Sequence, residues 1–132
     1  MYRYQILVEY VGTKFVGWQK QLKGKSIQKE IENKLSKLLK QKIIIYGSGR
    51  TDAGVHAIEQ SAHFDTKLKI KEIKKLIKSL IFFLNPKKIS IINIYKRKQQ
   101  FHARHSAKER VYKYFIINRL AAPTLENERA WH

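Results

Sequence analysis

The chain has 132 residues and carries 28 lysines and arginines against 10 aspartates and glutamates, a net charge of +18. This length allows one domain with a real core, and 43% hydrophobic residues, with seven Tyr, six Phe and two Trp, argue against disorder. The absence of cysteine excludes a disulfide scaffold, a thiolate metal site and a cysteine nucleophile. With no membrane-spanning apolar run and no signal-peptide core, we expect a cytoplasmic protein without a membrane partner.

The excess of positive charge favours a polyanionic partner. Codon bias toward lysine, as in A+T-rich genomes, is an alternative source of the charge. The distribution is uneven, because residues 67–98 hold eleven basic residues and a single acid, Glu72. A solvated helix face accounts for part of this imbalance, and a surface that follows phosphates accounts for it better.

The first half of the chain reads as strand, helix, strand, strand. Residues 2–10 alternate between apolar and polar, as in a half-buried strand. Ser26 can cap a helix over residues 27–39, whose apolar residues recur at helical spacing. Residues 43–46 form a short apolar strand, and residues 58–64 alternate again, with Ile58, Ala62 and Phe64 predicted to point one way.

The second half reads as helix, strand and one further strand. Residues 70–84 have a helical apolar stripe, which Pro86 closes. Residues 89–95 and 111–117 have the composition of strands. The order predicts an α+β fold, a ferredoxin-like βαββαβ arrangement plus an extra strand. We expect an antiparallel-rich sheet with helices on one face.

The segment between the predicted strands at residues 43–46 and 58–64 has the residues for chemistry. Glycines at 47, 49 and 54 allow tight turns and close approach to a ligand. Arg50 and Asp52 are two residues apart, so an extended backbone would point both the same way. Asp52 beside a guanidinium would stay ionised and can act as a nucleophile or base. A plain Asp-Ala-Gly turn is the alternative.

Several motifs together resemble the tRNA pseudouridine synthase A (TruA) family. Residues 49–57 (GRTDAGVHA) resemble its catalytic motif, and residues 10–21 (YVGTKFVGWQKQ) resemble the exit from its first strand. Residues 101–107 (FHARHSA) with 110–114 (RVYKY) resemble its second motif, and residues 129–132 its next block. The resemblance covers essentially the whole chain, in order.

The resemblance implies an isomerase that converts uridine to pseudouridine at positions 38, 39 and 40 of the tRNA anticodon stem-loop, without cofactor or metal. Asp52 falls on the catalytic aspartate, which attacks C1′ or C6 or assists loss of the C2′ proton. Arg50 falls on the motif arginine, which would orient Asp52 or fill the space left by the flipped nucleotide. Tyr112 falls on the tyrosine that stacks on the target uracil.

The remaining residues of these motifs are expected to bind the substrate. Thr51 belongs to the catalytic motif and Arg110 to the second motif. His102 and Arg104, also in the second motif, are expected near RNA phosphates or the cleft wall. The His102–His105 spacing resembles that of metal ligands, but without cysteine or an adjacent His-Glu pairing we expect no metal site.

Three departures from the family pattern stand out. Val11 replaces an aspartate, residues 80–86 lack the usual Gly-x-Asn, and the sequence ends at His132. We therefore expect residues 1–132 to be a single domain, the N-terminal half of a tRNA pseudouridine synthase catalytic domain. The missing C-terminal half would come from a partner chain, and family members form homodimers. The alternatives are a non-catalytic basic RNA-binding module and an inactive truncated remnant.

Overall fold

Four strands, two α-helices and one 3-10 helix make up the computed structural model, which describes residues 1–132. The element order confirms the predicted βαββαβ arrangement. In chain order the elements are β1 (Tyr2–Tyr10), α1 (Ile27–Leu39), β2 (Ile45–Gly47), β3 (Ala57–Thr66), α2 (Ile73–Leu84), η1 (Asn85–Lys87) and β4 (Ile89–Arg97).

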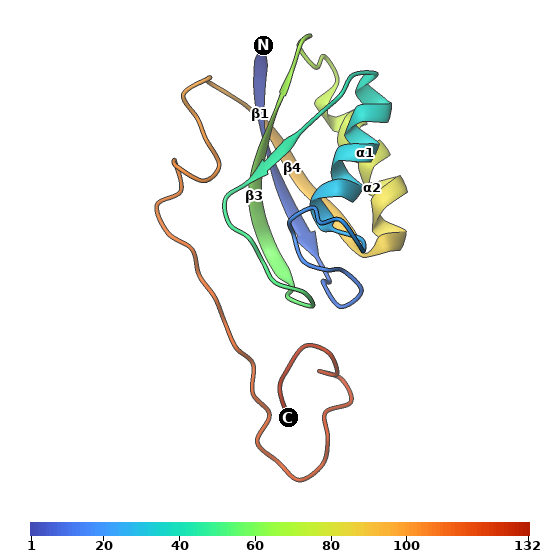
Figure 1. Cartoon of the computed structure of the whole chain (residues 1–132), viewed down its shortest axis with the longest axis vertical. Helices are drawn as coiled ribbons and strands as arrows, with labels where there is room; N and C mark the ends of the chain where they lie inside the picture. The colour runs from blue at the N-terminus through green and yellow to red at the C-terminus, as the bar shows by residue number, and fades with distance from the viewer.

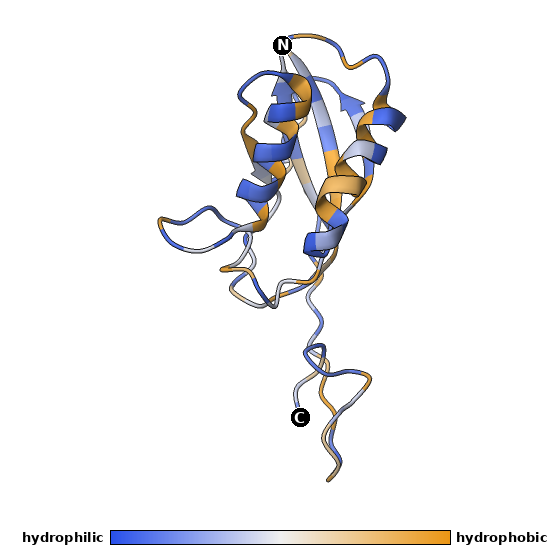
Figure 2. Ribbon diagram, turned by 90° about the vertical axis from the view of Figure 1, so that its right-hand side faces the viewer, coloured by the Kyte–Doolittle hydropathy of each residue, from blue (hydrophilic) through white to orange (hydrophobic).

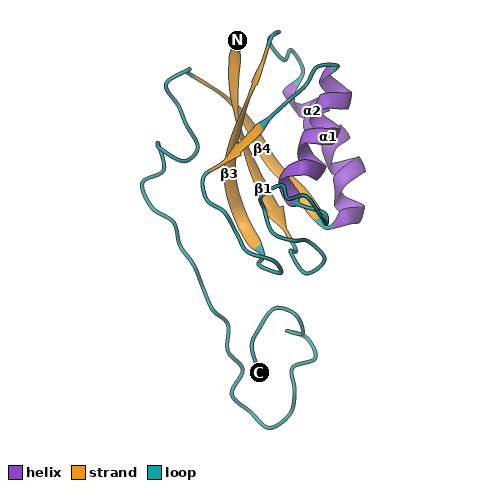
Figure 3. Ribbon diagram, in the orientation of Figure 1, coloured by secondary structure: helices purple, strands orange, loops and turns teal.

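The strands form one antiparallel sheet in the order β2-β3-β1-β4. Both helices pack against the same face of this sheet, so the molecule has two layers (Figures 1 and 3). This confirms the expected antiparallel sheet with helices on one face. We call the other side of the sheet its open face. Neither helix is long and apolar enough to cross a membrane.

The hydrophobic core lies between the sheet and the helices. Alternate residues of β1 from Tyr4 to Tyr10 are buried, as the alternation predicted. Helix α1 turns its apolar side toward the sheet and its polar side to solvent (Figure 2), whereas α2 buries one apolar side and leaves Phe82 and Phe83 exposed. Complete burial of an isoleucine or leucine side chain contributes roughly 1.5–3 kcal/mol to the free energy of unfolding. The helix residues buried in the core are Ile27, Ile31, Leu35, Leu76, Leu80 and Leu84.

The helix ends follow local chemistry. Ser26 caps α1 by accepting a hydrogen bond from the Lys29 amide at 3.1 Å, as predicted. Helix α2 begins at Ile73 rather than at residue 70, and no side chain caps its first turn. The Ile70 amide instead donates to the Tyr4 hydroxyl at 2.8 Å, so Ile70 packs against the core from outside the helix.

The predicted orientation of Ile58 is wrong. Ala62 and Phe64 are buried, but Ile58 is 76% exposed. The pairing of β1 with β3 shifts between Val8 and Tyr10, and this bulge turns the first residues of β3 relative to the rest. Strict alternation therefore fails at this end of the strand.

The predicted fifth strand at residues 111–117 does not form. A single parallel bridge, from Ile116 to Trp131, is the only strand-like pairing in this part of the chain. Figure 1 shows the segment after residue 98 passing the open face and then running away from the domain. A strand needs a neighbouring strand for its backbone hydrogen bonds, so the strand-like composition of residues 111–117 was not sufficient to form one here.

Candidate active site

Residues 48–56 form the catalytic-motif loop between β2 and β3. The Ser48 amide donates to the Ser61 carbonyl at 2.8 Å, which extends the β2–β3 pairing by one residue. The Val55 amide donates to the Asp52 carbonyl at 3.1 Å, and Gly54 takes a left-handed φ of 80°. This turn leaves Asp52 exposed. The loop therefore presents a carboxylate to solvent beyond the end of a rigid sheet.

Tyr10 and Trp18 support the loop at Thr51. The Tyr10 hydroxyl and the Thr51 hydroxyl are 2.7 Å apart and share a hydrogen bond, and the Trp18 amide donates to the Thr51 carbonyl at 3.1 Å. Both aromatic residues are 2% exposed, with ring centroids 6.1 Å apart. Burial raises the pKa of Tyr10. The residue before Asp52 is thus held from both its side chain and its backbone.

The segment after β1 approaches the loop at glycines. A Cβ on Gly17 would lie 2.5 Å from the Thr51 carbonyl oxygen, and one on Gly12 would lie 2.0 Å from that of Val55. The Gly12 amide also donates to His56 Nδ1 at 2.9 Å. Nε2 of His56 must then carry the proton that it shares with the Glu128 carbonyl at 2.6 Å. His56 therefore acts here as a structural bridge.

Asp52 and Arg50 are both exposed and form no ion pair with each other. The structure contains three side-chain ion pairs, Arg3–Asp65, Lys75–Glu72 and Lys87–Glu30, and none involves the loop. The expectation that Arg50 orients Asp52 directly does not hold in this structure. Both side chains are free to contact a ligand.

Tyr112 and Arg110 lie beside the loop at Gly49. The Tyr112 hydroxyl is 3.6 Å, and Arg110 Nε 3.5 Å, from the position that a Cβ on Gly49 would occupy. The Arg110 guanidinium donates to the Ser48 carbonyl. The structure therefore brings two residues of the second motif next to the catalytic motif, although more than fifty residues separate them in the sequence. Tyr112 is 62% exposed.

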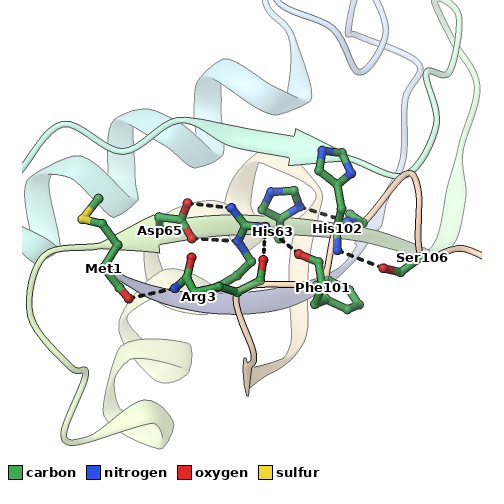
Figure 4. A network of polar contacts seen from close by, with 9 residues as sticks. Met1, Arg3, His63, Asp65, Phe101, His102 and Ser106 are labelled. Carbon is green, nitrogen blue, oxygen red and sulfur yellow. Dashed lines mark hydrogen bonds and ion pairs between the residues drawn. The ribbon is translucent and has the colours of Figure 1, made fainter.

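The second motif begins in a segment that docks on the open face of the sheet (Figure 4). Arg3 Nε and Nη2 donate to the two Asp65 carboxylate oxygens at 2.9 and 3.0 Å, and Nη1 donates to the carbonyls of Gln99 and Phe101. The hydrogen bond from Arg3 lowers the pKa of Asp65. The Arg3–Asp65 ion pair was not predicted from the sequence. Its only signal in the sequence was one charged residue at an outward-facing position of β1 and one at an outward-facing position of β3.

Histidines complete the docked segment, residues 98–106. The Ala103 amide donates to His63 Nδ1 at 3.0 Å, and the His63 and His102 ring centroids are 4.6 Å apart. Nδ1 of His102 accepts from the amides of Arg104 and His105, so this nitrogen shapes a turn. The Arg104 side chain is exposed. No group of three or more His, Cys, Asp or Glu side chains is arranged to hold a metal ion.

Comparison with known proteins assigns this fold and loop to a class. The family model described as tRNA pseudouridine synthase matches residues 6–106, from β1 through the docked segment and including Asp52. The chain belongs to the tRNA pseudouridine synthase family, a family of isomerases, which confirms the resemblance found in the motifs.

Several similar curated proteins are named tRNA pseudouridine synthase A. The chain is 66% identical over 132 residues to that of Pelagibacter ubique (strain HTCC1062), covering 100% of this chain and 54% of the relative. It is 44% identical over 132 residues to that of Anaplasma phagocytophilum (strain HZ), covering 98% and 53%. For Ehrlichia ruminantium (strain Welgevonden) the identity is 44% over 131 residues, covering 98% and 52%. The chain spans about half the length of the curated relatives it matches.

Proposed function

We propose that this chain takes part in converting uridine to pseudouridine at positions 38, 39 and 40 of the tRNA anticodon stem-loop, with Asp52 as the catalytic carboxylate. The observation that carries the proposal is the placement of Asp52. Its side chain is exposed and unpaired, while Tyr10 and Trp18 hold the preceding residue. A fixed backbone with a free carboxylate suits a group that must meet an extruded nucleoside.

The reaction rearranges bonds without net oxidation or reduction. The bond between C1′ and N1 breaks, the uracil rotates, and a bond between C1′ and C5 forms. C5 then loses its hydrogen as a proton, and N1 gains one. A carboxylate can attack C1′, attack C6 or remove the C2′ proton, and an ionised Asp52 at the sugar serves each route.

The neighbouring residues have complementary roles in this proposal. Tyr112 stacks on the flipped uracil, which restores roughly 1–3 kcal/mol of the stacking lost on extrusion. Arg50, exposed and unpaired, fills the space that the nucleotide leaves in the stem. Thr51 fixes the loop through its hydroxyl, and the exposed Arg104 beside His102 meets phosphate.

The proposal also concerns assembly. The catalytic-motif loop, with Tyr112 beside it, provides only one wall of the cleft that an extruded nucleoside would enter. The opposite wall would come from polypeptide equivalent to the other half of the relatives, in one chain, in a partner chain or across a homodimer. Closing the site in this way would exclude water from the reacting sugar.

Tritium release tests the activity. A tRNA labelled with tritium at uridine C5 loses the label as pseudouridine forms, and sequencing of the product gives the positions. We expect release at positions 38–40, reduced at least about a hundredfold by Asp52→Asn, with little change in RNA affinity. Glu59→Gln, which removes an exposed charge on β3, is the control and should retain activity.

The assay separates the alternatives. If the chain alone releases no tritium, it is repeated after addition of the second half of the Pelagibacter ubique relative. Full activity in Asp52→Asn would overturn the catalytic assignment. Tight tRNA binding without release under both conditions would identify an RNA-binding module, and neither binding nor release would identify an inert remnant.

A further inference from the structure

Arg110 uses its guanidinium on the protein's own backbone. Its Nε and Nη2 both donate to the Ser48 carbonyl, at 2.9 and 2.7 Å, and Nη2 also donates to the Arg104 carbonyl at 3.1 Å. No carboxylate pairs with it. These three hydrogen bonds use the planar fork that distinguishes arginine from lysine.

The two carbonyls belong to different parts of the site. Ser48 begins the catalytic-motif loop, and its amide is held by β3 at Ser61. Arg104 lies in the docked segment, whose backbone is fixed to the sheet through His63 and Arg3. Arg110 therefore connects two backbone segments that are each anchored to the sheet.

Gly49 provides the space for this connection. Arg110 Nε and Cδ and the Tyr112 hydroxyl all lie 3.5–3.6 Å from the position of a Cβ on Gly49. Tyr112 is two residues beyond Arg110, in a stretch that has no sheet partner. The guanidinium is thus the polar attachment that keeps the backbone leading to Tyr112 next to the loop.

We propose that Arg110 is a positioning residue, which sets the place of Tyr112 relative to Asp52 by clamping the carbonyls of Ser48 and Arg104. This inference rests on the proposed function, because it assigns Arg110 a part in the same site. It replaces the expectation that Arg110 binds the substrate, for which a guanidinium would use RNA phosphate. The Nε and Nη2 donors are all directed to the backbone, so only Nη1 is left to meet a phosphate, and the side of the guanidinium that forms the fork is already occupied.

Arg110→Lys and Arg110→Gln distinguish a clamp from a phosphate contact. Lysine keeps the charge but lacks the fork, so a clamp is lost in both variants. We expect kcat to fall roughly 10- to 100-fold in both, with KM and the salt dependence of tRNA binding nearly unchanged. A phosphate contact predicts the opposite, namely that Lys retains the rate while Gln weakens binding and lowers the salt slope by about one.

Amide hydrogen exchange in the free protein provides a readout that does not need activity. The Ser48 and Trp18 amides are hydrogen-bonded at either side of the loop, to Ser61 and to Thr51. We expect both to lose protection in the two Arg110 variants and to keep it in Arg129→Lys, a matched change at an exposed arginine of the same segment. Arg110 lies outside the hydrophobic core, so the urea midpoint should remain close to that of the unchanged chain.

The hydrogen-exchange results for the Arg110 variants can be interpreted independently of the activity assay. Unchanged protection in both variants, or full activity in Arg110→Lys, would overturn the clamp. If tritium is never released, the proposed function fails, and the exchange measurement still decides whether Arg110 holds the loop.

Discussion

His63 is a buried ionisable residue on the open face of the sheet. It is 1% exposed, and burial lowers its pKa to about 4, with the charges of Arg3 and His102 acting in the same direction. Its Nδ1 accepts the hydrogen bond from the Ala103 amide. The neutral ring is therefore the form that docks the segment leading to Tyr112.

This environment predicts that the fold loses stability in mild acid. An unfolded histidine has a pKa of about 6.5, so between that value and about 4 the unfolded chain binds more protons than the folded one. The contribution of His63 is complete above pH 6.5 and falls as pH decreases toward 4. We expect a loss on the order of 1–2 kcal/mol, measured by urea unfolding from pH 7.5 to 4.5.

Two substitutions isolate the effect of His63. His63→Gln keeps an acceptor for the Ala103 amide but does not titrate, so its stability should depend less on pH over this range. His132→Gln removes an exposed histidine and should leave the dependence unchanged. Equal slopes in the unchanged chain and in His63→Gln would contradict the assignment.

At the residue scale, the sequence identified the residues of the motifs but not their contacts. Asp52 and Tyr112 were named through the family resemblance, and the fold places Tyr112 beside the loop of Asp52. The expected pairing of Arg50 with Asp52 is absent, because neighbours in sequence need not pair when both can be solvated. Ser48, which accepts from Arg110, and Ala103, which donates to His63, each lie forty or more residues from their partner, and spacing carries no information about such contacts.

The segment after β1 acts as a support for the catalytic-motif loop, and Gly17 is where it meets the residue that precedes Asp52. Gly17 has a φ of 113°, and a Cβ there would lie 2.5 Å from the carbonyl oxygen of Thr51, the residue before Asp52. Gly54, in the same loop as Asp52, also has a positive φ of 80°, but nothing lies within 4 Å of its Cβ position. Substitutions at these two glycines therefore distinguish two effects: strain from a positive φ, which both positions share, and a steric clash with Thr51, which only Gly17 has.

Gly17→Ala should therefore be much more damaging than Gly54→Ala. Both pay the cost of a left-handed backbone, roughly 1–2 kcal/mol, but only Gly17→Ala forces the Thr51 backbone to move. We expect a further loss of stability of about 1–3 kcal/mol and reduced protection of the Trp18 amide in Gly17→Ala alone. Urea unfolding and amide exchange measure the two effects, and equal behaviour of the variants would refute the support role.

At the element scale, the hydrophobic periodicity of the sequence correctly predicted the strands and helices that pack against the core. The alternation in β1 and the helical stripe of α1 both identified buried faces, because burial imposes these periods. Residues 111–117 have a strand's composition without a strand's partner, so the prediction failed there. A strand is a property of a pair of segments, and half of the relatives' length lies outside this chain.

Two groups of exposed basic residues lie in different layers of the molecule. Helix α2 and the turn before it contribute four exposed lysines to the helix layer, Lys71, Lys74, Lys75 and Lys78. Arg104, Lys108 and Lys113 belong instead to the stretch that runs from the open face past the catalytic-motif loop, and they too are exposed. Net charge alone does not distinguish the two groups, but only the second group belongs to the stretch that contacts the catalytic-motif loop.

The salt dependence of tRNA binding distinguishes these two groups. Each phosphate contact contributes about 0.9 to the slope of log K against log salt, whereas charges that only add to the overall field are largely screened at physiological ionic strength. If tRNA lies along the second motif, replacing Arg104, Lys108 and Lys113 with Gln should lower the slope by about 2–3. Replacing the lysines at 71, 74 and 75 with Gln removes the same charge from the helix layer and should change the slope by less than about one. A larger change in the helix-layer variant would place the tRNA on the helix layer instead of along the second motif, whose Arg110 and Tyr112 lie beside the catalytic-motif loop, and would contradict the proposed substrate path.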